Sequence, residues 1–255
     1  MPTSISVNTG GGRYVVRGLT VLAILIAPWL CLSDAGASMD IRSSPASRLD
    51  FSLLLQQNNL VLANAEHSLE TDFSGFGFQA VDMPPDLPIQ IGLGGGYAFV
   101  NQTTVSGLNG ANPDNTTLNN DNMGGYYFSL LARTGLFTNE HWSSQAVFTY
   151  EYLAVERNGE TQNSRLHWNH FTAEANLDYF LSYYFSVRLG AVYGSLKAKL
   201  SGSGDNNVNI SLDTDEQFAA YVGVDYHLPE DQKVTLTLQQ GYNNRIVIQF
   251  QRTFY

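Results

Sequence analysis

Apolar and polar side chains alternate one by one along most of the chain, and this pattern limits the fold more than any other feature. The odd-numbered positions from Phe171 to Tyr179 are apolar, whereas the even-numbered positions from His170 to Asp178 are polar. A period of two residues is that of a β-strand, because successive side chains point to opposite faces. The pattern recurs at 89–99, 126–136, 146–152, 185–194, 218–226, 234–239 and 246–251. The sequence therefore predicts an all-β protein.

The positions of the charges favour a membrane barrel over a soluble β-sandwich. The polar faces carry Glu151, Glu174 and Arg188 near the middle of their strands. A dry sandwich core does not tolerate such charges unless they are paired. The apolar faces are almost free of charge over the roughly 10 residues that a strand needs to cross a bilayer. These strands are thus predicted to face lipid on one side and a polar lumen on the other.

The connections and the aromatic residues support the same interpretation. Short connections are predicted at 138–140, 181–184 and 229–232, and they alternate with longer, polar ones at 103–123, 158–164 and 202–210. Outer-membrane barrels alternate short periplasmic turns with longer outer loops in this way. Aromatic residues gather beside the short connections, as in Phe180, Tyr183, Tyr184 and Phe185. Such rings suit the membrane interface.

Strand counting predicts a closed antiparallel transmembrane β-barrel of ten strands. Eight strands follow Pro88, and the segments Arg48–Gln57 and Phe73–Val81 supply one further hairpin. An eight-stranded barrel with an N-terminal extension is the alternative. The sheet must close in either case, because an open edge in hydrocarbon leaves backbone groups unpaired at several kcal/mol each.

The first residues are predicted to be a signal peptide rather than part of the barrel. Arg13 and Arg17 precede an apolar stretch from Leu19 to Leu32, and Ala35-Gly36-Ala37 provides the small residues of a cleavage site. We expect a signal peptide at 1–37, a short N-terminal segment at 38–47 and the barrel at 48–255. The single cysteine, Cys31, falls inside the predicted signal peptide, so the mature chain is expected to hold no disulfide.

The signal peptide, the alternating strands and the aromatic C-terminus from Phe250 to Tyr255 together resemble the small outer-membrane β-barrel proteins, the opacity-protein and porin-like group. This resemblance implies location in the outer membrane of a Gram-negative cell. It also implies contact with outer-membrane lipid and with the barrel-assembly machinery. The net charge of −10 argues against a nucleic-acid partner, because phosphates need a basic surface. No external ligand is indicated.

The inward face holds a cluster of charges that forms the candidate site. Asp178 and Arg188 flank one hairpin and are expected within ion-pair reach of each other. A salt-bridged plug that satisfies the interior charges is favoured, because side chains can largely fill so narrow a barrel. A constriction that selects ions is the alternative. The predicted lumen cluster is Arg133, Glu151, Glu174, Asp178, Arg188 and Asp225.

No catalytic, cofactor-binding or metal-binding set is predicted. Asp225-Tyr226-His227 has the Asp-x-His spacing of the omptin proteases, and His141-Trp142-Ser143 has the His-x-Ser of lipid A deacylases. Both lie beside short connections and have no aligned partner group. The sequence thus predicts a non-enzymatic barrel with a structural or surface-contact role and a charged, largely plugged lumen. A narrow porin-like channel is the alternative, and a membrane-embedded lipid or peptide hydrolase is less favoured.

Overall fold

The computed structural model describes residues 48–64, 67–84, 88–107, 122–158, 162–204, 208–214 and 217–255. The strands in these residues are β1 (Arg48–Ala63), β2 (His67–Met83), β3 (Ile89–Gly107), β4 (Met123–Thr138), β5 (Trp142–Asn158), β6 (Gln162–Phe180), β7 (Phe185–Gly204), β8 (Val208–Asp213), β9 (Phe218–Leu228), β10 (Gln232–Gly241) and β11 (Asn243–Phe254). None of the described residues forms a helix long and apolar enough to cross a membrane. The predicted signal peptide lies outside the described residues.

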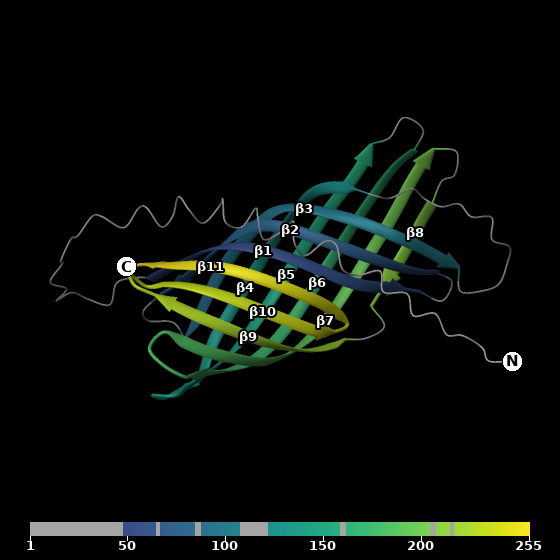
Figure 1. The fold of residues 1–255 in the computed structure, drawn as a ribbon. Coiled ribbons are helices and arrows are strands. Elements are labelled where there is room, and N and C mark those ends of the chain that lie inside the picture. The colour runs from purple at the N-terminus through teal and green to yellow at the C-terminus, as the bar shows by residue number, and fades with distance from the viewer. Residues whose placement is uncertain are drawn as a thin grey trace, which may run out of the picture. The chain divides into compact units, whose positions relative to one another are not determined.

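The strands close into an antiparallel ring of ten (Figure 1). β1 pairs with β2 on one side and with β11 on the other, from Leu49 opposite Phe254 to Leu60 opposite Asn243. β8 and β9 both pair with β7, at 197–202 and 185–193 respectively, so they occupy one interrupted position in the ring. The prediction of ten strands is confirmed, and the segments 48–57 and 73–81 lie in β1 and β2.

The strands differ in length, and the longer ones project at only one of the two ends of the barrel. β9, β10 and β11 have 10 to 12 residues, whereas β1 to β7 have 16 to 20. We call periplasmic the end with the turns at 139–141, 181–184 and 229–231, because short turns face the periplasm in such barrels. The longer strands extend past the β10–β11 turn at the opposite, outer end. There the predicted connections 158–164 and 202–210 are mostly strand.

The exterior carries the predicted apolar band. Phe171, Leu189 and Val222 are 46%, 56% and 42% exposed. Such side chains in contact with water would form a large unfavourable patch, whereas hydrocarbon accommodates them. Aromatic residues form two girdles on this surface. Trp142 and Tyr179 are in ring contact near the periplasmic end, and the ring contacts of the outer girdle are Tyr97 with Tyr126 and Tyr193 with Phe218.

The interior of the outer end is apolar, whereas the sequence predicts only a polar, charged lumen. Above the girdle the alternation changes phase, and apolar side chains point inward. Arg165 and Glu156 form an exposed ion pair on the outer surface at 3.1 Å. The inward apolar residues, which we call the outer core, are Leu60, Leu62, Leu69, Phe73, Ala98, Val100, Met123, Tyr127, Leu153, Val155, Leu166, Trp168, Leu196, Ala198, Leu200 and Leu212. This end is therefore packed like a soluble β-protein.

Candidate functional site in the barrel lumen

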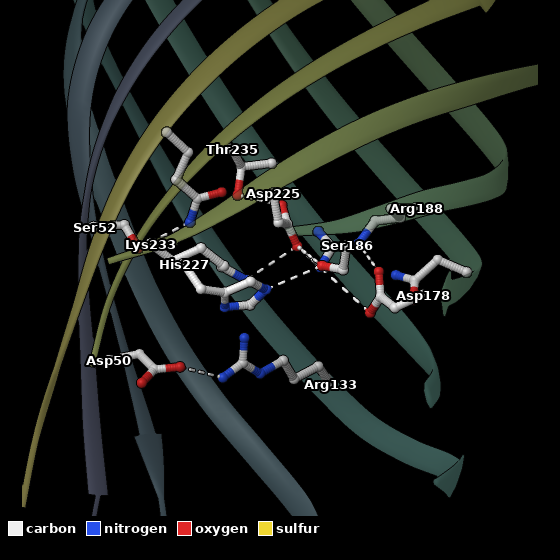
Figure 2. Close-up of polar contacts among 12 residues, drawn as sticks. Asp50, Ser52, Arg133, Asp178, Ser186, Arg188, Asp225, His227, Lys233 and Thr235 are labelled. Carbon is white, nitrogen blue, oxygen red and sulfur yellow. Dashed lines mark hydrogen bonds and ion pairs between the residues drawn. The ribbon is translucent and has the colours of Figure 1, made fainter. Parts of the chain in front are cut away.

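Inward side chains of β6, β7, β9 and β10 form an ionic network near the periplasmic end. Arg188 Nε donates to Asp178 Oδ1 at 2.6 Å, and Arg188 Nη2 lies 3.2 Å from Asp225 Oδ2. Lys233 Nζ lies 3.6 Å from the same Asp225 oxygen, while Thr235 Oγ1 donates to Asp225 Oδ1 at 2.6 Å. Figure 2 shows these side chains converging on Asp225 inside the ring of strands. We call them the Asp225 cluster.

A second network, the Asp50 cluster, lies on the opposite part of the wall. Arg133 Nη2 on β4 contacts Asp50 Oδ2 on β1 at 2.7 Å, across two intervening strands (Figure 2). Thr253 Oγ1 donates to Asp50 Oδ1 at 2.7 Å, and Arg133 Nε donates to Gln90 Oε1. Asp50 is 3% exposed. A buried carboxylate of this kind requires such partners, because an unpaired buried charge is strongly unfavourable.

The middle of the lumen is held by hydrogen bonds to tyrosines. Tyr221 on β9 donates to Glu174 on β6. Tyr242, between β10 and β11, has its hydroxyl 2.9 Å from His170 Nε2. Both rings lie against glycines of β7: a Cβ on Gly190 or Gly194 would come within 2.3 Å of the Tyr221 or Tyr242 ring, respectively. Because Gly190 and Gly194 have no side chain, the two rings have room to lie against the inner face of β7.

A cavity of about 230 Å³ lies along the polar lumen. Its lining includes Glu151 of β5 and Arg245 of β11, together with side chains of the two ionic networks. Arg245 Nη2 donates to Gln56 Oε1, whereas its Nε is buried and has no hydrogen-bond partner. A smaller group of residues lines a second cavity, of about 280 Å³, beside the β10–β11 turn: Asn59, Leu60, Val61, Thr214, Gly241, Tyr242 and Asn244.

The structure places all six predicted lumen residues on the inward face, in three groups. Asp178, Arg188 and Asp225 lie together. Arg133 pairs with Asp50 instead, Glu174 bonds to Tyr221 and Asn176, and Glu151 lines the cavity beyond them.

The predicted lumen cluster omits three charged residues that the structure places in the lumen: Asp50, Lys233 and Arg245. Their parity on β1, β10 and β11 places them on the inward face, and this parity was readable from the sequence. Their partners were not, because Asp50 and Arg133 are 83 residues apart and their contact depends on how the ring closes.

The lumen also contains a serine–histidine pair. Ser186 Oγ lies 3.1 Å from His227 Nε2 (Figure 2). Ser186 is only 1% exposed, and a nucleophile needs access to its substrate. Among the described residues Asp225 contacts Ser186, Arg188, Lys233 and Thr235 rather than orienting the imidazole as a catalytic triad requires. The geometry favours a structural hydrogen bond.

No known protein-family profile matches this sequence, and no curated protein matches it either. Solved structures with a similar fold include the outer membrane protease OmpT from Escherichia coli, at 12% identity and a TM-score of 0.46 over 85% of this chain and 99% of that chain. An outer membrane channel from Pseudomonas putida F1 is 10% identical, with a TM-score of 0.44 over 86% and 100%. Ail of Yersinia pestis is 12% identical, with a TM-score of 0.38 over 82% and 99%. Likeness at this level carries no argument about activity.

Proposed function

We propose that the protein is a non-enzymatic outer-membrane barrel with a closed lumen, and that it has a structural or surface-contact role. The observation that carries this proposal is the outer core, which fills the barrel interior from wall to wall. Phe73 on β2 packs against both Trp168 on β6 and Tyr127 on β4, with ring centroids 5.5 Å and 6.3 Å apart. These strands are not neighbours in the sheet.

The outer core opposes the passage of ions because its side chains are apolar and buried. Phe73, Leu153 and Leu166 are completely buried, and Trp168 is 1% exposed. An ion that entered this layer would lose its hydration shell and gain no charged partner, which is how hydrophobic constrictions close channels. The Asp225 and Asp50 clusters add a second obstruction near the periplasmic end. The closed lumen favours a protein that acts through its surface.

The outer surface supports the surface-contact part of the proposal. The long strands carry polar groups outward beyond the aromatic girdle, including the Arg165–Glu156 ion pair and the Tyr152–His167 hydrogen bond of 2.9 Å. These groups stand on rigid strands, so they offer a preformed surface at little cost in conformational entropy. The sequence and the structure assign no partner to this surface.

Conductance measurement tests the closed lumen directly. Purified wild-type protein is inserted into planar bilayers after its folded state is confirmed by heat-modifiable migration in electrophoresis. We expect no steady conductance, whereas a porin measured in the same bilayers conducts. A sustained ohmic current from folded wild-type protein would overturn the proposal and favour the narrow channel. The observation in favour of that alternative is the polar cavity of about 230 Å³.

The hydrolase alternative rests on three side chains and has its own test. Ser143, Ser186 and His227 are replaced singly by alanine, and the wild type and the variants are tested for lipid and peptide hydrolysis. We expect no hydrolysis above background from any of them. Turnover by the wild type that is lost in Ser186→Ala and His227→Ala, and retained in Ser143→Ala, would instead establish a catalytic pair.

A further inference from the structure

The polar cavity of the lumen holds two opposite charges that do not pair with each other. Arg245 reaches it from β11 and Glu151 from β5. No ion pair within 4.0 Å joins either of them to another side chain in the part of the chain that the structure describes. Each side chain therefore keeps capacity for a partner of opposite charge.

Arg245 differs in this respect from the other lumen cations. Arg133, Arg188 and Lys233 each lie within 3.6 Å of an aspartate oxygen. Arg245 instead donates through Nη2 to the neutral Gln56, and its Nε is buried without a partner. Arg245 is half-buried and lines the cavity, so its guanidinium keeps donors that Gln56 does not occupy, and a carboxylate is the strongest acceptor for such donors.

Further polar groups at the same cavity lack partners. The Tyr127 side chain lines the cavity and is only 7% exposed, and its hydroxyl has no hydrogen-bond partner. The side-chain oxygen of Asn176, also in the lining, has none either. Buried polar atoms are rarely left in this state. Tyr127 and Asn176 therefore add uncharged polar side chains to the lining that also holds Arg245 and Glu151.

The volume of the cavity limits the size of an occupant. The cavity measures about 230 Å³, which is below the roughly 300–1,000 Å³ of sites for drug-sized ligands. Since a water molecule occupies about 30 Å³ in the liquid, a solute with the bulk of several waters would fit. The outer core forms an apolar boundary on one side, so the charged groups of a solute would be directed to the lumen side chains.

We propose that this cavity binds a small zwitterion of amino-acid size, whose carboxylate contacts Arg245 and whose ammonium group contacts Glu151. A molecule with both charges satisfies both side chains at once, whereas a simple anion or cation leaves one of them unpaired. The inference goes beyond the proposed surface role and does not depend on it. A barrel that conducts no ions can still bind a solute in its lumen.

Calorimetric titration of the folded, detergent-solubilised protein tests this binding. The probes are L-alanine, acetate and ethylammonium, which carry both charges, the negative charge alone and the positive charge alone. We expect alanine to bind about tenfold or more tightly than either single-charge probe, because only alanine forms both charge-assisted contacts. No binding of alanine at millimolar concentration, or equal binding of all three probes, would overturn the proposal.

Two substitutions assign the contacts. Arg245→Gln is expected to weaken alanine and acetate and to spare ethylammonium, whereas Glu151→Gln should weaken alanine and ethylammonium and spare acetate. Arg252→Gln is the matched control, because Arg252 faces outward on the same strand and pairs with Glu230 at 3.5 Å. Heat-modifiable migration verifies that each variant is folded.

Tyr127→Phe removes one unpartnered hydroxyl with little change in volume and is a milder second variant should Arg245→Gln not fold. It is expected to weaken alanine binding a few-fold. Unchanged binding of alanine in Tyr127→Phe and Glu151→Gln, both folded, would contradict the assigned site. Binding in the lumen and conductance are measured in separate experiments. Absence of alanine binding would leave the closed-barrel proposal intact, and an observed current would leave the zwitterion-binding proposal intact.

Discussion

Phe73 on β2 packs against Trp168 on β6 across the barrel interior, with the ring centroids 5.5 Å apart. Three strands separate β2 from β6 in the sheet, so this contact joins opposite walls and not neighbours. Both side chains are at most 1% exposed. The contact joins two walls of the barrel and makes its outer end part of a packed core.

Phe73→Ala should therefore destabilise the folded barrel strongly. Deleting a buried aromatic ring leaves a cavity and typically costs about 3–5 kcal/mol. Phe171→Ala is the control, because Phe171 is 46% exposed on the lipid-facing side of β6 and its removal creates no cavity. The free energy of unfolding is measured by urea titration in detergent, with heat-modifiable migration in electrophoresis as the readout of the folded fraction. A loss of stability in Phe73→Ala no larger than that in Phe171→Ala would contradict the role of the outer core.

A second prediction concerns the buried carboxylate at the centre of the Asp225 cluster. Asp225→Asn keeps the shape of the side chain but leaves Arg188 and Lys233 with less compensating charge, since both contact the same oxygen. Removing one partner of a buried ion pair typically costs about 3–5 kcal/mol. Glu156→Gln is the comparison, because its ion pair with Arg165 is exposed and such pairs contribute below about 1 kcal/mol. The same urea titration applies, and equal effects would show that the lumen network is solvated and weak.

The sequence predicts the architecture well because a single rule determines it. Where the strands cross the membrane, alternation with period two assigns apolar side chains to lipid and polar ones to the lumen. It places Phe171 outward and His170 inward, and the structure confirms both placements. The eight predicted strands after Pro88 follow from the same rule, and the segments 48–57 and 73–81 supply the other two strands of the ring. Parity and a short turn predict Asp178 within ion-pair reach of Arg188, and in the structure the two residues lie directly opposite each other.

The outer core was not predicted, because its pattern is the same alternation with the phase reversed. Leu166 and Trp168 are even-numbered, like the polar His170 that follows them, and all three point inward. The change from an apolar outer face to an apolar inner face between Trp168 and Phe171 marks where the strand leaves the membrane. Contacts across the lumen, such as that of Phe73 with Trp168, could not be predicted from the sequence because they depend on how the ring of strands closes.

A third prediction follows from the glycines of β7. An alanine at position 190 would place its Cβ 2.3 Å from the Tyr221 ring, so the ring must move and its hydrogen bond to Glu174 must break. Gly190→Ala is expected to lower stability by about 1–3 kcal/mol, as for overpacking in general. Gly135→Ala is the control, because nothing lies within 4 Å of its Cβ position. Combining Gly190→Ala with Tyr221→Ala should cost less than the sum of the two single changes, and strict additivity would argue against the contact.

The last prediction concerns Tyr242, which lines both the lumen cavity and the cavity of about 280 Å³ beside the β10–β11 turn. Among the described residues, pairing of β1 with β11 ends at Leu60 and β1 next pairs with β8 at Ala63. The Tyr242 side chain lies at this interruption and separates the two spaces. Its hydroxyl contact with His170 holds it in place.

Tyr242→Ala should join the two cavities and open a side route into the lumen. A cysteine in place of Thr172, which lines the lumen cavity, reports on this route in a Cys31→Ser background. We expect a membrane-impermeant thiol reagent added to intact cells to label this cysteine faster when Tyr242 is alanine. Tyr221→Ala is the matched control, because Tyr221 belongs to the same buried cluster and lumen lining but does not line the side cavity. If both variants accelerate labelling equally, general loosening of the barrel explains the effect and Tyr242 is not the barrier.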